Sequence, residues 1–304
     1  MIAEEDERAD QMILLSKANE KRALSGSAKT FAPHFFVIGA MKAGTTTLNR
    51  YLDQRSDTGM PRIKETDFFL RDRRAGLGME WYKSQFDLSR QCLGEVSPNY
   101  TKYDIFPGVP QRIHAVAPDA KLIFIARDPV ARFASHYRHS WLHGHMRKAP
   151  ENLLSSENGR HMIECSRYAN QLEKYLAYFD RSQLLIVDFD ILCRSPQVVV
   201  DEITGFLGLP REQVKEIGAA NTADQVARIP PFVKRLARSR LGRHIDRFIP
   251  NDTKQALGRA VSRRHPIYAP VLGTSVLQAA RDLLREDTAR FRKLAGPSFE
   301  QWSI

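Results

Sequence analysis

Residues 35–48 read FFVIGAMKAGTTTL, which joins a short apolar run to a glycine-bounded turn and then to an amphipathic pattern. The first four residues predict a buried strand, and apolar residues recur at helical spacing from Leu48. Gly39 and Gly44 permit a sharp turn between the two elements. A strand that turns directly into a helix directs several unpaired backbone N–H groups at one point, which suits a phosphate or another anion.

The lysine of this turn distinguishes it from a Walker A loop. A Walker A loop ends in Gly-Lys-Ser or Gly-Lys-Thr, whereas here Gly44 is followed by Thr45 and Lys42 lies two residues before the glycine. Lys42 and the positive end of the helix dipole would both favour a bound phosphate. The residues alone leave two interpretations open, a phosphate-binding turn and an ordinary strand-to-helix turn with a solvated lysine.

The composition indicates a globular chain. Its 304 residues are 42% hydrophobic and 9% aromatic, which is enough for a full core. Three widely spaced cysteines favour neither a disulfide framework nor a zinc site. No apolar run reaches the roughly 18 residues that span a bilayer. We expect a soluble, cytoplasmic protein, with residues 1–30 as a polar N-terminal extension and 31–304 as one domain.

The net charge of +11 is concentrated in one segment. Residues 228–264 contain eleven lysines and arginines against two aspartates, and Pro230, Pro231 and Pro250 break their pattern. We expect a basic helical insertion there. Such a segment could attract a polyanionic donor, an acidic acceptor, nucleic acid or a membrane surface.

Strands and helices alternate along the rest of the chain. The apolar run at 121–126 is typical of a central parallel strand that is covered on both faces. Asp128 and Pro129 then predict the N-cap and the first position of a helix. The alternation predicts an α/β fold, a P-loop-like three-layer domain with a central, mainly parallel sheet and helices on both faces. Ligands bind beyond the carboxyl ends of such strands, where Lys42 and Arg127 fall.

A second candidate phosphate site follows that strand. Residues 127–137 read RDPVARFASHY. Arg132 and Ser135 are three residues apart and share a helix face near Arg127, which gathers two guanidinium groups and a hydroxyl. Guanidinium groups bind phosphate in bidentate fashion, although arginines at a helix start also pair with surface carboxylates.

Together these motifs resemble those of sulfotransferases that use 3′-phosphoadenosine 5′-phosphosulfate (PAPS). The turn resembles their 5′-phosphosulfate loop, and 127–137 resembles their 3′-phosphate motif, in the order that the family shows. The resemblance spans roughly residues 34–210, and it implies PAPS as co-substrate, adenosine 3′,5′-bisphosphate (PAP) as product and no metal. The donor-binding residues that it implies are Lys42, Ala43, Gly44, Thr45, Thr46, Thr47, Arg127, Ser135 and, on a poorer local match, Arg264.

The resemblance also implies the catalytic residues. Residues 64–69 read KETDFF and are similar to the Lys-Glu-x-x-Phe-Phe segment of the heparan-sulfate and bacterial branches, whose glutamate is the catalytic base. Glu65 inherits that role by position, Lys42 would contact the oxygen that bridges sulfate and 5′-phosphate, and Lys64 would stabilise the sulfuryl group. A carboxylate between lysines is also an ordinary ion pair. The rival base is a histidine from the group His136, His139, His143 and His145.

The acceptor site is expected around Glu65, Ser97, Tyr100 and His136. Residues 94–100 read GEVSPNY and are similar to a pocket segment of relatives, although Glu95 can equally be structural. We expect sulfuryl transfer to a hydroxyl or amine of a glycan, lipid or natural product, with the oligomeric state left open.

Two other functions compete with this interpretation. A P-loop kinase or NTPase would require the Gly-Lys-Ser/Thr ending and a carboxylate for Mg²⁺. A basic nucleic-acid or membrane-surface binding protein would use residues 228–264, but their arginines lack interleaved aromatic stacking platforms. We therefore expect no nucleic-acid partner and no stable membrane insertion.

Overall fold

The computed structural model describes residues 31–70, 75–146, 152–215, 269–296 and 299–304. Almost all of them belong to one compact unit, Pro33–Ile304. The predicted extension at 1–30 and the predicted basic insertion at 228–264 lie outside the described residues. Both therefore stay predictions.

Five parallel strands form a central sheet in the order β2-β3-β1-β4-β5. The central strand pairs Phe35 with Gly94 on one side and with Lys121 on the other. A Cβ on Gly94 would lie 2.0 Å from the Phe35 ring, so only glycine fits at that crossing. The strands are β1 (Phe35–Gly39), β2 (Thr58–Gly59), β3 (Cys92–Val96), β4 (Lys121–Ala126) and β5 (Leu184–Asp188).

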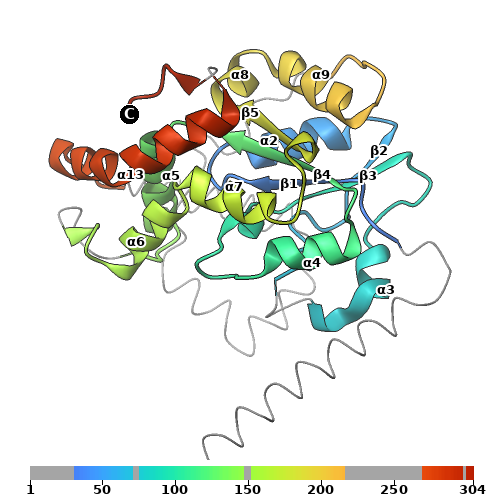
Figure 1. Ribbon diagram of the computed structural model, residues 1–304, viewed down its shortest axis with the longest axis horizontal. Coiled ribbons are helices and arrows are strands. Elements are labelled where there is room, and N and C mark those ends of the chain that lie inside the picture. Colours follow the sequence, from blue (N-terminus) through green and yellow to red (C-terminus); the bar gives the residue numbers. More distant parts are fainter. Residues whose placement is uncertain (1–30, 71–74, 147–151, 216–268, 297–298) are drawn as a thin grey trace, which may run out of the picture. The chain divides into compact units, whose positions relative to one another are not determined.

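Helices cover both faces of this sheet, which confirms the predicted three-layer α/β fold. Figure 1 shows α2 (Thr45–Asp53), α8 (Phe189–Arg194) and α9 (Pro196–Leu207) above the strands, and α4 (Val109–Val116) and α7 (Tyr168–Leu176) below them. The contacts agree, because α2 touches α9 and α4 touches α7. The remaining helices are α3 (Gly78–Lys83), α5 (Pro129–Leu142), α6 (Glu157–Glu164) and α13 (Thr274–Ala295), with short 3-10 turns at Ala75–Leu77, Pro98–Thr101 and Arg181–Gln183.

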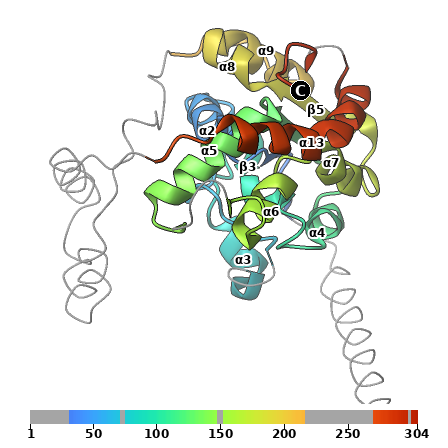
Figure 2. The same cartoon turned by 90° about the vertical axis from the view of Figure 1, so that its left-hand side faces the viewer.

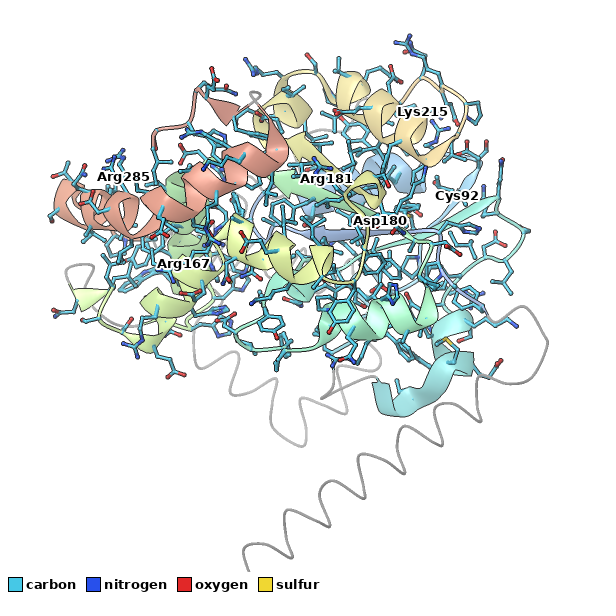
Figure 3. The ribbon with its side chains drawn as sticks, in the orientation of Figure 1. Cys92, Arg167, Asp180, Arg181, Lys215 and Arg285 are labelled. Atoms are coloured by element: carbon cyan, nitrogen blue, oxygen red, sulfur yellow. The ribbon has the colours of Figure 1, made fainter. Side chains whose placement is uncertain are left out.

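The 22-residue helix α13 packs against α5, α6 and α7 (Figure 2). Ala280, Leu284 and Phe291 of this helix are buried, whereas Leu277 and Leu294 are only partly buried. Arg181, labelled in Figure 3, donates a hydrogen bond of 2.9 Å to the Leu294 carbonyl and so fixes the end of this helix beside β5. No helix among the described residues is long and apolar enough to cross a membrane.

One buried acid on α13 has a role that its spacing does not predict. Asp287 accepts hydrogen bonds from the N–H groups of Ala169 and Asn170, at 3.0 and 2.9 Å. These groups belong to the first turn of α7, so a carboxylate from one helix caps the start of another.

The cysteines are free thiols in different environments. Cys92, labelled in Figure 3, is buried at the start of β3, and Cys165 is also buried. Cys193 is exposed on α8. Cys92 is thus a core residue and Cys193 is not.

Candidate active site

The turn between β1 and α2 presents unpaired donors at a helix start. The first hydrogen bond within α2 runs from Leu48 N to Gly44 O at 3.0 Å, so the N–H groups of Thr45, Thr46 and Thr47 have no partner inside the helix. Lys42 and Gly44 both adopt left-handed backbone conformations, with φ of 70° and 85°. This conformation is uncommon for lysine and clusters at functional sites. The turn can therefore receive an anion.

The Lys42 ammonium lies among other cations. Its Nζ is 3.2 Å from Nδ1 of His139. Burial, which is the largest cause, and the guanidinium groups of Arg127 and Arg132 together lower the pKa of Lys42 to about 8, and Glu65 opposes them. Among the described residues, Lys42 makes no ion pair with a carboxylate. A bound anion would supply the missing negative charge.

The second motif contacts the first. Nη1 of Arg127 donates to the Lys42 carbonyl at 3.2 Å, and its guanidinium carbon lies 4.7 Å from the centre of the Phe189 ring. Tyr168 donates to the Arg127 carbonyl at 2.8 Å. The structure thus brings together two motifs that are 85 residues apart, at the carboxyl ends of β1 and β4.

The start of α5 follows this contact. The Asp128 side chain accepts hydrogen bonds from Val130 N and Ala131 N at 2.9 and 2.8 Å, which confirms the predicted N-cap. Ser135 lies half-buried on the same helix. Its predicted contact with the donor stays a prediction.

Arg132 supports the turn instead of facing a ligand. It is completely buried, and its Nε donates to Ser166 Oγ at 2.7 Å. Its Nη2 donates to Met162 O at 2.6 Å and its Nη1 to Met41 O at 3.4 Å. The expectation that Arg132 joins Arg127 at a phosphate is therefore wrong, because residue spacing fixes a helix face but not the groups packed against it.

The histidines divide into two environments. His136 is buried, with its Nδ1 3.2 Å from Nη1 of Arg132, and burial lowers its pKa well below the ordinary value. The predicted contact of His136 with an acceptor stays a prediction. Burial also lowers the pKa of His139, to about 3, so its neutral ring can accept a hydrogen bond from Lys42. The ring centres of His139 and His143 lie 4.2 Å apart.

The loop that carries Glu65 has an unusual backbone. Glu65 and Asp67 have φ of 60° and 52°, and neither is glycine. Such residues persist only where their surroundings hold them. Lys64 donates a hydrogen bond to the Glu65 carboxylate, both side chains are half-buried, and Asn99 donates to Asp67 at 3.1 Å. Glu65 therefore stands in a fixed loop, close enough to influence the pKa of Lys42.

A buried carboxylate holds this loop from behind. Glu95 is completely buried and accepts hydrogen bonds from Thr66 N (3.1 Å), Thr66 Oγ1 (2.5 Å), Tyr82 OH (2.6 Å), Ser97 Oγ (2.6 Å) and Tyr100 OH (3.0 Å). Burial raises the pKa of Glu95, and these hydrogen bonds oppose the rise. The structural role for Glu95 therefore agrees with the geometry.

This network includes two residues of the predicted acceptor site. Ser97 is 0% and Tyr100 1% exposed, and both hydroxyls donate to Glu95. Through Glu95 both hydroxyls help to hold the Glu65 loop. Their direct contact with an acceptor stays a prediction.

Lys102 is a cation that the sequence analysis missed. It directly follows the turn Pro98–Thr101 and is half-buried. Burial lowers its pKa, whereas Cys165, Glu65 and Asp67 raise it. Within the described part of the chain its ammonium has no ion-pair partner. The only signal in the sequence is its place two residues beyond the 94–100 segment.

Two further expectations concern groups beyond this cluster. Arg264 lies outside the described residues, so its contact with the donor stays a prediction. Among the described residues, no group of three or more His, Cys, Asp and Glu side chains is placed to hold a metal ion.

Comparisons with known proteins agree with this geometry. The family model described as "Sulfotransferase domain" matches residues 32–245. A sulfotransferase structure from Alicyclobacillus acidocaldarius superimposes with a TM-score of 0.62 at 23% identity, over 90% of this chain and 100% of that chain. This likeness shows the shared fold.

Curated relatives are similar over part of their own length. Mouse bifunctional heparan sulfate N-deacetylase/N-sulfotransferase 4 is 33% identical over 58% of this chain and 22% of the relative. Mouse heparan sulfate glucosamine 3-O-sulfotransferase 3B1 is 27% identical over 90% of this chain and 66% of the relative. The chain spans about a fifth to about half the length of the first relatives that it matches. Since the family model covers most of the chain, the protein belongs to the sulfotransferase domain family.

Proposed function

We propose that this protein transfers a sulfuryl group from PAPS to a hydroxyl or amine of an acceptor. The observation that carries the proposal is the 3.2 Å contact between Arg127 and the backbone of the phosphate turn at Lys42. This contact joins the two candidate phosphate sites into one surface at the edge of the sheet where ligands of α/β folds bind.

The residues present fit such a donor. The N–H groups of Gly44 to Thr47, together with Ala43 and Lys42, would hold the 5′-phosphosulfate, and Arg127 and Ser135 would hold the 3′-phosphate. Lys42 and Arg127 make no ion pair with a carboxylate among the described residues, so an anionic ligand finds their charge unneutralised. PAPS supplies the sulfuryl group, and PAP departs when the bond between sulfur and the bridging oxygen breaks.

The side chains around this surface can perform in-line transfer. Glu65 takes the proton of the acceptor as the acceptor's oxygen or nitrogen forms its bond to sulfur. Lys42 stabilises the negative charge on the leaving oxygen, and Lys64 stabilises the sulfuryl oxygens. His139 is the weaker candidate base, because its pKa is about 3 and its Nδ1 contacts Lys42.

We infer that the acceptor is a glycan or small molecule that carries negative charge near its reactive group. The names of the curated relatives support a glycan, since they act on heparan sulfate. The half-buried Lys102 supports the negative charge, because its ammonium lies near Glu65 without an ion-pair partner among the described residues.

Radiolabelled PAPS and a panel of acidic and neutral acceptors test the reaction and the acceptor together. We expect Lys42→Ala and Arg127→Ala to abolish transfer, the second mainly through weaker PAP binding. Lys293→Ala, at an exposed lysine of α13, is the matched control and should transfer normally. Near-normal transfer by either active-site variant would refute the site. Transfer of phosphate from ATP in place of sulfate would support a kinase instead.

A further inference from the structure

We propose that residues 299–304 position Arg127 and thereby contribute to recognition of the donor's 3′-phosphate. This inference rests on the proposed function, because it takes PAPS as the donor. Hydrogen bonds connect this segment to the ends of the two neighbouring strands β4 and β5.

Two aspartates at those strand ends hold the segment. Asp128 caps α5 with Oδ1 and accepts a 2.6 Å hydrogen bond from Ser303 N with Oδ2. Asp188 caps α8 in the same way, with Oδ1 2.6 Å from Asp190 N, and its Oδ2 accepts from Gln301 Nε2 at 3.3 Å. Each carboxylate therefore uses one oxygen for a helix and the other for the segment.

Arg127 lies between these two anchor points. It directly precedes Asp128, and its guanidinium stacks on Phe189, the residue that follows Asp188. The strands β4 and β5 are paired at this end, with Ala126 opposite Asp188. A segment that bridges both aspartates consequently fixes the residues on either side of the Arg127 side chain.

A third contact reaches the Arg127 backbone. The buried Trp302 stacks on Phe291 of α13, with ring centres 5.3 Å apart and 11° between the planes. Its ring also lies 6.0 Å from that of Tyr168, whose hydroxyl donates to the Arg127 carbonyl at 2.8 Å. Packing of Trp302 thus helps to hold Tyr168, and with it the peptide group of Arg127.

Arginines of α13 secure the segment itself. Arg292 donates to the carbonyls of Phe299 and Ile304 at 3.1 and 2.6 Å, and Arg281 donates to Ser303 O at 3.2 Å. Hydrogen bonds from a charged donor are stronger than neutral ones. The segment is therefore fixed on α13 and can transmit that rigidity to Arg127.

A pair of substitutions at exposed Ser303 tests the proposal. Ser303→Pro removes the backbone N–H group that donates a hydrogen bond to Asp128, whereas Ser303→Ala keeps this group. Calorimetry should measure the dissociation constants of PAP and of adenosine 5′-monophosphate, which lacks the 3′-phosphate. We expect Ser303→Pro to weaken PAP binding about tenfold, as for the loss of one hydrogen bond to a charged group, and to change monophosphate binding less than about twofold. Ser303→Ala should bind both as the wild type does.

The two nucleotides separate positioning from general destabilisation. An equal loss of affinity for both nucleotides, or no loss of affinity for PAP, would overturn the inference. If thermal melting shows that Ser303→Pro does not fold, Gln301→Ala decides instead, with an expected loss of about threefold for PAP alone. A wild-type protein that does not bind PAP would refute the proposed function itself. A wild-type protein that binds PAP, together with a Ser303→Pro variant that binds it equally well, would refute only the inference about residues 299–304.

Discussion

PAP binding should weaken as the pH rises above about 8, because the ligand-free protein then loses a proton from Lys42. Burial lowers the pKa of Lys42 to about 8, with contributions from Arg127, Arg132 and Arg138, and Glu65 opposes the change. A bound phosphate beside Lys42 restores the pKa toward its ordinary value of 10.5. Binding therefore takes up a proton between these two pH values.

The size of the effect follows from the two pKa values. At pH 7 Lys42 is almost fully protonated with or without ligand, so its protonation adds little to the free-energy cost of binding PAP. At pH 9 only about one ligand-free molecule in ten is protonated, so the dissociation constant rises about tenfold, or about 1.4 kcal/mol. The sign is opposite for folding: the unfolded chain binds more protons than the ligand-free fold in this window, so Lys42 makes the free energy of unfolding rise with pH.

Calorimetry in buffers of different ionisation enthalpy measures both the affinity and the proton uptake. Lys42→Arg stays protonated throughout, so its affinity should be lower but independent of pH. His161 has a pKa of about 9, which makes His161→Gln the necessary control, and this variant should keep the dependence of the wild type. A wild-type affinity that is constant from pH 7 to 9 would refute the reasoning.

Three further predictions concern the candidate base, the buried Glu95 and a histidine ion pair. Glu65→Gln should lower turnover about 10²–10⁴-fold, as for loss of a general base, with the PAP dissociation constant unchanged; weaker PAP binding would indicate a structural role. Glu95→Ala should lower the free energy of unfolding by about 3–5 kcal/mol, because it leaves buried hydroxyls unpaired, and urea denaturation measures this with the milder Glu95→Gln as comparison. Burial lowers the pKa of His161, but its hydrogen bonds to Asp104 and Cys165 outweigh burial and raise the pKa to about 9. The protonated His161 therefore stabilises the fold fully below pH 6.5, and this contribution to the free energy of unfolding is lost as the pH rises through 9. His161→Gln should therefore cost about 1 kcal/mol at pH 6, allowing for solvent screening, and little at pH 10, where an equal cost would disprove the ion pair with Asp104.

Local patterns were sufficient to predict several helices and strands and the strand ends at which the two candidate phosphate motifs lie. The apolar run of β4 and the Asp128 cap depend on residues that are adjacent in the chain, and both are confirmed. The approach of Arg127 to Lys42 follows from parallel topology, because adjacent parallel strands end at the same edge of the sheet.

Other features depend on packing between distant segments. The Arg132 side chain donates hydrogen bonds to Ser166 and Met162, and the residue pattern of its own helix cannot identify these partners. The Asp287 cap of α7 joins residues 118 apart. Lys102 carries no motif at all, and its significance depends on which charges the fold places around it.

Thr66 has a consequence for changing the acceptor by protein engineering. Its N–H and hydroxyl are both bound by Glu95, so it belongs to a constant framework. Asp67, the next residue, is half-buried and pairs with half-buried Asn99. Because the Asn99–Asp67 hydrogen bond also holds the loop that carries Glu65, a library that seeks new acceptors should leave positions 66, 67 and 99 unchanged and vary residues outside this framework.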